Sequence, residues 1–207
     1  MWSSEVTNMI ITGIWETLYM TLVSTLVGYV IGLPMGIILT VSDKDGIKPN
    51  AVLYKILDVI ANIVRSVPFI ILLVLLIPFT RLVVGKSYGS TATIVPLVIA
   101  AAPYIARMVE SSLKEVDAGV IEAARSMGAS NFTIITKVML VEARTSLLVG
   151  ATITLGTILG YSAMSGAVGG GGLGAIAIRY GYTRWQTDIM IVTVCLLYTS
   201  PSPRDRS

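Results

Sequence analysis

The sequence predicts an all-α membrane protein, and three observations support this expectation. Hydrophobic residues make up 54% of the 207 residues and charged residues only 13%, whereas soluble domains carry roughly 25% charged residues. The mean hydropathy is +0.80. Several stretches reach the length of about 20 apolar residues that a helix needs to cross a bilayer core. A chain of this composition cannot hide its apolar surface from water, so lipid is its expected solvent.

Four complete spans and part of a fifth are expected, over 17–41, 56–80, 90–108, 147–168 and 186–198. The first contains 25 residues without a charge. The last is incomplete, because the apolar stretch 189–198 makes only about 15 Å of helix. Residues 199–207 (TSPSPRDRS) are polar and broken by proline, so they cannot span lipid. We interpret 8–198 as a single transmembrane domain with a truncated fifth span, and 199–207 as a truncated or foreign tail.

The distribution of basic residues predicts the orientation. Eight Lys or Arg residues flank the spans on the side that holds the loops 42–55 and 107–146, against four on the other side. Basic residues gather in cytoplasmic loops. The N-terminus is therefore expected outside, and the long loop 107–146 in the cytoplasm.

Missing residue types exclude most enzyme chemistry. The chain has no histidine and one cysteine, Cys195. It therefore cannot hold a Ser-His-Asp triad, a zinc site with histidine ligands or an internal disulfide. No catalytic residues, no metal site and no cofactor bound by this chain are expected, although carboxylate or Ser-Lys chemistry stays open.

Two glycine patterns resemble nucleotide sites but lack the required context. Gly85-Lys86-Ser87 has Thr80 where a phosphate-binding loop needs glycine. Residues 169–174 match GxGxxG only because 169–172 are all glycine, and no βαβ unit surrounds them. We interpret this run as a flexible or tightly packed connection outside the membrane.

Small residues mark helix-packing faces in two spans. In the first span they recur every four residues, at Ser24, Gly28, Gly32 and Gly36. Thr152, Gly156 and Gly160 repeat the pattern in the fourth. Such stripes let two helices approach closely, within a bundle or across a subunit interface.

The cytoplasmic loop contains a short helix whose two ends are visible in the sequence. Asp117 is a natural N-cap, and Gly128 suits the position after the C-cap. A second helix is expected to start near Ser130 and to run toward the fourth span.

The faces of this short helix differ in polarity. Val120, Ala124 and Met127 share one face, and Glu122 and Arg125 are spaced to pair on the other. Acidic residues around the helix, namely Glu110, Glu115, Asp117 and Glu122, are expected on a solvated surface rather than in a paired-carboxylate site.

This loop resembles the EAA loop of ABC importer permeases. In that family EAA is followed by three residues, Gly, nine residues, Ile, one residue and Leu-Pro. The corresponding residues here are Glu122-Ala123-Ala124, Gly128, Val138 and Leu140, with Val141 in place of the proline. Three further stretches resemble methionine-uptake permeases: RSVPFIILL at 65–73, AAPYIARMVE at 101–110, and GYSAMSGAV at 160–168 with RYGY at 179–182.

The resemblance implies a type I ABC importer permease: a five-span bundle with a cytoplasmic coupling helix at about 117–128. It implies a bacterial inner-membrane subunit surrounded by lipid, which works with a second copy of itself, two ATPase subunits and an external methionine-binding lipoprotein. ATP and Mg²⁺ would bind the ATPase, and no nucleic acid is expected. The residues expected to couple to the ATPase are Glu122, Ala123, Ala124, Arg125 and Gly128.

Tyr161 and Met164 are candidates for the substrate path, although a methionine in a span is often only packing. The function expected is import of D- or L-methionine. Another small amino acid transported by the same class of importer is the alternative. An intramembrane enzyme and a passive channel or scaffold are less favoured, because the spans lack facing catalytic charges and neither function explains the EAA helix.

Overall fold

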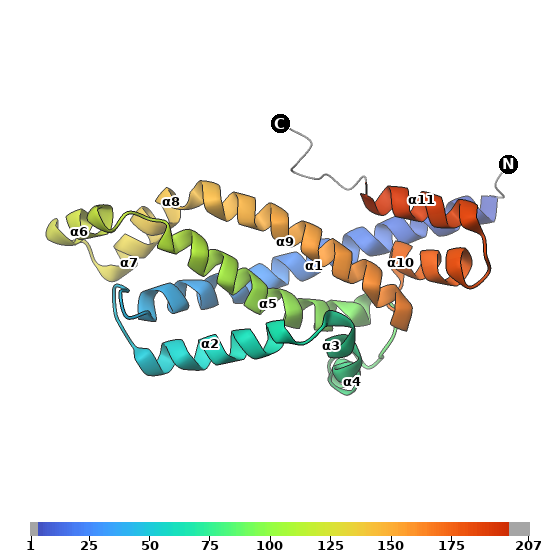
Figure 1. Ribbon diagram of the computed structural model, residues 1–207, viewed down its shortest axis with the longest axis horizontal. Helices are drawn as coiled ribbons and strands as arrows, with labels where there is room; N and C mark the ends of the chain where they lie inside the picture. The colour runs from blue at the N-terminus through green and yellow to red at the C-terminus, as the bar shows by residue number, and fades with distance from the viewer. Residues whose placement is uncertain (1–3, 199–207) are drawn as a thin grey trace. The chain divides into compact units, whose positions relative to one another are not determined.

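The computed structural model describes residues 4–198, and within that range it contains helices and no strands (Figure 1). The helices, with η marking π or 3₁₀ segments, are α1 (Ser4–Ser42), α2 (Ala51–Ser66), α3 (Phe69–Leu75), α4 (Ile77–Val84), α5 (Ser90–Lys114), α6 (Ala118–Ser126), α7 (Asn131–Thr133), η1 (Ile134–Met139), α8 (Leu140–Glu142), α9 (Arg144–Ser165), η2 (Gly166–Val168), α10 (Gly172–Ile176), η3 (Ala177–Tyr182) and α11 (Thr187–Tyr198).

The described chain divides into two compact units. The first unit comprises the described parts of 1–27, 67–100 and 155–207, and the second comprises 28–66 and 101–154. In the first unit Met20, Leu97 and Ile158 are almost completely buried. In the second unit the same holds for Leu39, Ile105 and Ile134. Each unit therefore contains fully buried apolar side chains.

Three helices have the length and composition of membrane spans. They are α1, α5 and the helical stretch that starts with α9. α1 has 39 residues, about 58 Å of helix, so it begins 13 residues before the expected span at 17–41. α5 likewise runs six residues past the expected end at 108. Charged residues inside these extensions hid them from a search for uncharged stretches.

The span expected over 56–80 is divided among α2, α3 and α4. α2 ends at Ser66, and Pro68 precedes α3 with φ −55° and ψ 133°. Proline has no N–H to donate and disfavours helical geometry in the residue before it. The expected span therefore does not form one continuous helix, and α2 and α3 are bent by 102° at the break.

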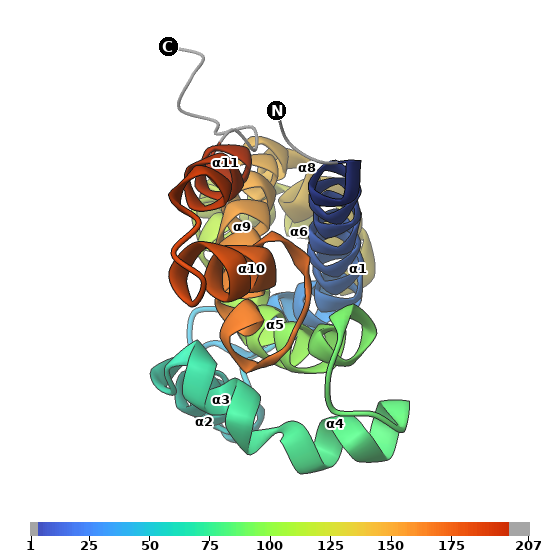
Figure 2. The ribbon, with the colours of Figure 1, turned by 90° about the vertical axis from the view of Figure 1, so that its right-hand side faces the viewer.

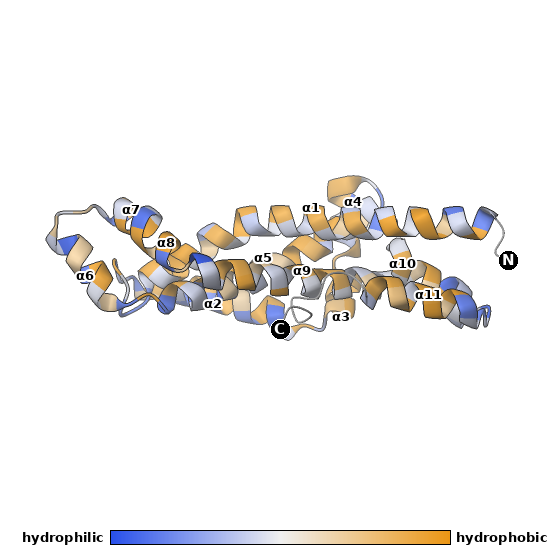
Figure 3. Ribbon diagram, turned by 90° about the horizontal axis from the view of Figure 1, so that it is seen from above, coloured by the Kyte–Doolittle hydropathy of each residue, from blue (hydrophilic) through white to orange (hydrophobic). Residues whose placement is uncertain are grey.

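The remaining expected spans differ only at their ends. α9 covers 144–165, and the 3₁₀ turn η2 continues to Val168, the expected end of the fourth span. α11 covers 187–198 and is mostly apolar (Figure 3). The predicted tail at 199–207 lies outside the described residues.

Most of the glycine run at 169–172 is closely packed. A Cβ on Gly170 would lie 2.8 Å from the Ser165 carbonyl oxygen, and one on Gly172 would lie 2.6 Å from Thr17 Oγ1. Glu16 in α1 accepts a hydrogen bond from the Gly172 N–H at 2.6 Å. Thr17 Oγ1 accepts another from the Leu173 N–H at 2.9 Å. Side chains of α1 thus cap α10, which packs with η3 and α11 in the same unit (Figure 2).

Candidate functional site

Helix α6, in the second unit, begins at the residue expected to cap it. Asp117 has an extended backbone with φ −60° and ψ 128°, and its carboxylate accepts a hydrogen bond from the Gly119 N–H at 2.7 Å. This bond satisfies one of the amide groups that every helix start leaves unpaired.

The other end of α6 is closed by Gly128, whose φ is +81°. The Gly128 N–H donates to the Arg125 carbonyl at 3.0 Å, and the Ala129 N–H donates to the Ala124 carbonyl at 3.1 Å. These two bonds form a Schellman motif, which requires the left-handed backbone that glycine adopts without strain. α6 is therefore a short helix with fixed ends.

The face of α6 that carries Val120, Ala124 and Met127 is only partly buried. Ala124 is buried, whereas Val120 and Met127, expected on the same face, are 41% and 81% exposed. The small Ala124 side chain is covered, whereas the two larger apolar side chains reach solvent. Glu122 and Ala123 are also exposed. The outward surface of α6 is therefore partly apolar and carries one carboxylate.

Within residues 4–198, the expected Glu122–Arg125 ion pair does not form. Arg125 instead donates to the backbone carbonyl of Ile47 at 3.1 Å, in the connection between α1 and α2. A groove of about 680 Å³ lies beside this contact, lined by residues from that connection and from α6. The i,i+3 spacing would allow Arg125 to pair with Glu122, but the Arg125 guanidinium donates to a residue distant in the sequence instead.

The segment after α6 begins at Ser130, as expected, and its hydroxyl accepts from the Thr133 N–H at 3.3 Å. The chain continues as α7 and then as the π-helical segment η1. π-Helical segments often occur near functional sites. Phe132, in α7, is 75% exposed. The sequence pattern did not predict a role for Phe132, although an aromatic residue between Asn131 and Thr133 is unusual for an exposed position. Blue, hydrophilic bands alternate with apolar ones along α6 and α7 (Figure 3).

One of the acidic residues assigned to a solvated surface is buried. Glu110 is only 4% exposed and accepts hydrogen bonds from Arg107 at 2.7 Å and from Lys114 at 2.8 Å. The structure corrects that assignment, because α5 continues beyond the expected end of the span and carries Glu110 against its neighbours. The other three, Glu115, Asp117 and Glu122, are exposed, as expected.

The two substrate-path candidates lie one turn apart on α9, in the first unit. The Tyr161 ring stacks on Phe69 of α3, with centroids 4.5 Å apart and an interplanar angle of 6°. Met164 is 51% exposed. Tyr161 is thereby held against the helix that follows the Pro68 break.

The glycine stripe of α1 lies against α5. A Cβ on Gly32 would lie 2.7 Å from the Ala102 carbonyl oxygen, and one on Gly36 would lie 2.6 Å from that of Ala106. Gly28 is less closely packed, and Ser24 is fully buried. Around Gly156 and Gly160 in α9, by contrast, no described heavy atom would lie within 4 Å of a Cβ. Within residues 4–198, no group of three side chains is arranged to hold a metal ion.

Comparisons with known proteins identify the family. A profile of the family described as binding-protein-dependent transport system inner membrane component matches residues 28–201. The D-methionine transport system permease protein MetI of Escherichia coli is 53% identical over 158 residues, covering 76% of this chain and 73% of that protein. A MetI permease protein of Vibrio cholerae is 49% identical over 196 residues, covering 95% of this chain and 87% of its own length.

A solved structure shows the same architecture. A chain in an inward-facing structure of the MetNI methionine ABC transporter matches with a TM-score of 0.93 and 52% identity, covering 95% of this chain and 91% of that one. The family profile covers most of the sequence, and it includes α6 with both of its caps. The chain therefore belongs to the family of binding-protein-dependent transport system inner membrane components.

Proposed function

We propose that this chain is the permease subunit of an ATP-driven methionine importer. The observation that carries the proposal is its 52% identity, over 95% of its length, to a chain of the MetNI methionine ABC transporter. Two copies would form the membrane path, with two ATPase subunits on the cytoplasmic side and a methionine-binding lipoprotein outside. ATP and Mg²⁺ would bind the ATPase, so this chain itself would catalyse no reaction.

The contact with the ATPase is assigned to α6. Its ends are fixed by the Asp117 cap and the Gly128 motif, so the helix is preorganised to bind. Val120, Met127 and Phe132 expose apolar surface, and Glu122 adds a charge that can select a basic partner. Alternating access would follow when the ATPases move the two copies of α6 together.

The orientation proposed is N-terminus outside, with the 107–146 segment in the cytoplasm. Its support is the excess of basic residues beside that segment, eight against four. The test uses single cysteines at Asn8 or Asn131 in a Cys195→Ser background. A membrane-impermeant maleimide applied to intact cells should label position 8 and spare position 131, and the opposite pattern would invert the assignment.

The substrate is tested by reconstitution. The permease, its ATPase and its binding lipoprotein are placed in liposomes with ATP on the ATPase side, and uptake of labelled D- and L-methionine is measured. We expect ATP-dependent uptake of methionine. An excess of about tenfold of another small amino acid should not reduce it, which requires that the competitor binds more than about 1.4 kcal/mol more weakly. Uptake of a different amino acid, with methionine inactive, would favour the alternative substrate.

A further inference from the structure

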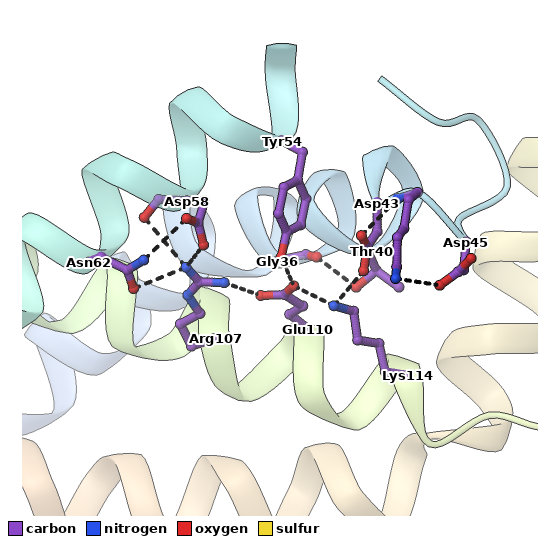
Figure 4. Close-up of polar contacts among 11 residues, drawn as sticks. Gly36, Thr40, Asp43, Asp45, Tyr54, Asp58, Asn62, Arg107, Glu110 and Lys114 are labelled. Atoms are coloured by element: carbon purple, nitrogen blue, oxygen red, sulfur yellow. Dashed lines mark hydrogen bonds and ion pairs between the residues drawn. The ribbon is translucent and has the colours of Figure 1, made fainter. Parts of the chain in front are cut away.

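A cluster of charged and polar side chains joins three segments of the second unit (Figure 4). One member follows the end of α1, three lie on α2 and three on α5. The members are Asp43, Tyr54, Asp58, Asn62, Arg107, Glu110 and Lys114. We refer to these seven residues as the charge cluster.

Glu110 is the centre of the charge cluster. Its side chain is 6% exposed, and it accepts hydrogen bonds from Tyr54 at 3.2 Å, Arg107 at 2.7 Å and Lys114 at 2.8 Å. A carboxylate removed from water to this extent is stable only while its partners stay in place. Separating α2 from α5 would take Tyr54 away from it.

Arg107 forms the second link between α2 and α5. It is paired with Asp58, and it donates to the Asn62 side-chain oxygen at 3.1 Å. Asn62 in turn donates to Asp58 at 3.2 Å. Because a guanidinium presents its donors in a fixed plane, these contacts set the register of the two helices as well as their distance.

The charge cluster is also connected to both ends of helix α6. Lys114, the last residue of α5, is three residues before Asp117, the N-cap of α6, and pairs with Asp43 at 2.6 Å. At the far end Arg125 donates to Ile47 in the connection that begins with Asp43. The contacts close a ring from α5 through α6 and the α1–α2 connection back to α5.

A contribution to stability alone is a weak explanation for this arrangement. Partly buried ion pairs add little net stability compared with apolar side chains of similar size, but they fix geometry. The cost of removing these charges from water falls at the place where α6 joins the spans. α2 then leads directly, through Val67 and Pro68, to α3 and the Phe69 ring that stacks on Tyr161.

We propose that Asp58, Arg107 and Glu110 are positioning residues that keep α2, the end of α5 and α6 together as one rigid piece throughout the transport cycle. A movement that the ATPase imposes on α6 is thereby carried to α2. The inference rests on the proposed function, because it requires that α6 receives the movement. It adds the residues that pass the movement on.

The first experiment compares Asp58→Asn with Asp45→Asn in the complete reconstituted transporter. Both variants remove one carboxylate charge from the second unit, but the Asp45 side chain is 85% exposed, and its one ion pair within residues 4–198 is with its neighbour Lys44 at 3.9 Å. Copurification with the ATPase, the rate of ATP hydrolysis and methionine uptake are measured on the same preparations.

Asp58→Asn should leave copurification and ATP hydrolysis intact and should lower the methionine transported per ATP about fivefold or more, the usual lower end of a coupling effect. Asp45→Asn should match the wild type in all three. A merely structural role would instead lower copurification, hydrolysis and uptake together. An unchanged ratio in Asp58→Asn overturns the proposal.

A second experiment restores the link covalently. Asp58→Cys and Arg107→Cys are combined in a Cys195→Ser parent and joined by a short bifunctional thiosulfonate, which a reductant releases. The open double variant should transport little methionine per ATP, the joined form should regain transport, and reduction should abolish it again. A joined form that hydrolyses ATP but transports no better than the open form shows that α2 and α5 must separate, which overturns the proposal.

Measurements on the wild-type complex distinguish failure of the proposed function from failure of the role assigned to the charge cluster. If the wild-type complex takes up no methionine, the proposed function fails, whatever the variants do. If the wild type takes up methionine and Asp58→Asn behaves like Asp45→Asn, only the role of the charge cluster fails.

Discussion

Replacing the glycines of the α1 stripe one at a time by alanine tests the packing of α1 against α5. A single methyl group is added in Gly28→Ala, Gly32→Ala and Gly36→Ala, all three in the same helix. The surroundings differ in one respect. A Cβ on Gly36 would meet the Ala106 carbonyl oxygen and Val109 Cβ, both at 2.6 Å, whereas one on Gly28 would meet the tip of Ile105 at 3.0 Å and Ala101 Cβ at 3.1 Å.

These distances give the expected order of the effects. Moving Gly36 from 2.6 Å to an ordinary contact of 3.4 Å requires α1 and α5 to separate by about 0.8 Å, because a backbone oxygen cannot rotate away. Overpacking of this kind costs about 1–3 kcal/mol. At Gly28 the Ile105 side chain can move, and the better helix propensity of alanine, up to about 1 kcal/mol, offsets the remaining cost.

The assay is thermal unfolding of the assembled transporter in detergent, with uptake measured on the same material. Gly32→Ala and Gly36→Ala should lower the melting temperature by about 2–4 °C for each kcal/mol lost. Gly28→Ala should lie close to the wild type, and it serves as the matched control. The packing argument is wrong if Gly28→Ala destabilises as much as Gly36→Ala, or if all three variants unfold with the wild type.

Three further predictions concern the α6 region. Gly128→Val places a β-branched residue at φ +81°, at a cost of about 1–3 kcal/mol, and should uncouple ATP hydrolysis from uptake; unchanged uptake with both partners present would contradict the coupling role. Glu122→Lys reverses an exposed charge and should weaken copurification with the ATPase, whereas full retention would show that this face does not dock. The hydrogen bond from Lys114 holds the pKa of the Asp43 carboxyl below its usual value. The pair therefore stabilises the fold above the unfolded pKa of about 3.9, and loses that effect as the pH falls through the folded pKa. The free energies of unfolding of wild type and Asp43→Asn, obtained from thermal melts, should differ by a constant amount of roughly 1 kcal/mol or less above about pH 5. The difference should disappear as the pH falls below the unfolded pKa and through the lower folded pKa; a difference that persists once the carboxyl is protonated would contradict the pairing.

Local sequence signals predicted α6 well because its ends depend on neighbouring residues. Asp117 and Gly128 each act within a few positions, through a side-chain cap and a left-handed backbone. The same reasoning failed for Arg125, because the choice between Glu122 and Ile47 as its partner depends on a contact 78 residues away. The uncharged runs predicted apolar helices from local composition, but composition alone did not predict the break at Pro68.

The charge cluster could not be predicted from one sequence alone. Arg107 and Asp58 are 49 residues apart, and charges near the ends of spans are usually solvated. A signal was nevertheless present in the spacing. Arg107, Glu110 and Lys114 repeat at helical intervals that place them on one face of α5. That pattern shows which face is charged, but only the fold shows what the face meets.

Glycine packing and charge pairing have complementary effects on the second unit. The stripe at Gly32 and Gly36 sets how close α1 and α5 lie, because backbone atoms meet directly. Arg107 and Glu110 set the register of α2 against α5, because their hydrogen bonds with Asn62 and Tyr54 are directional. Helices that are fixed in both distance and register move together. When they move, the chain is expected to bend where its backbone hydrogen bonding is interrupted. Pro68, which has no N–H to donate, provides such an interruption directly after α2.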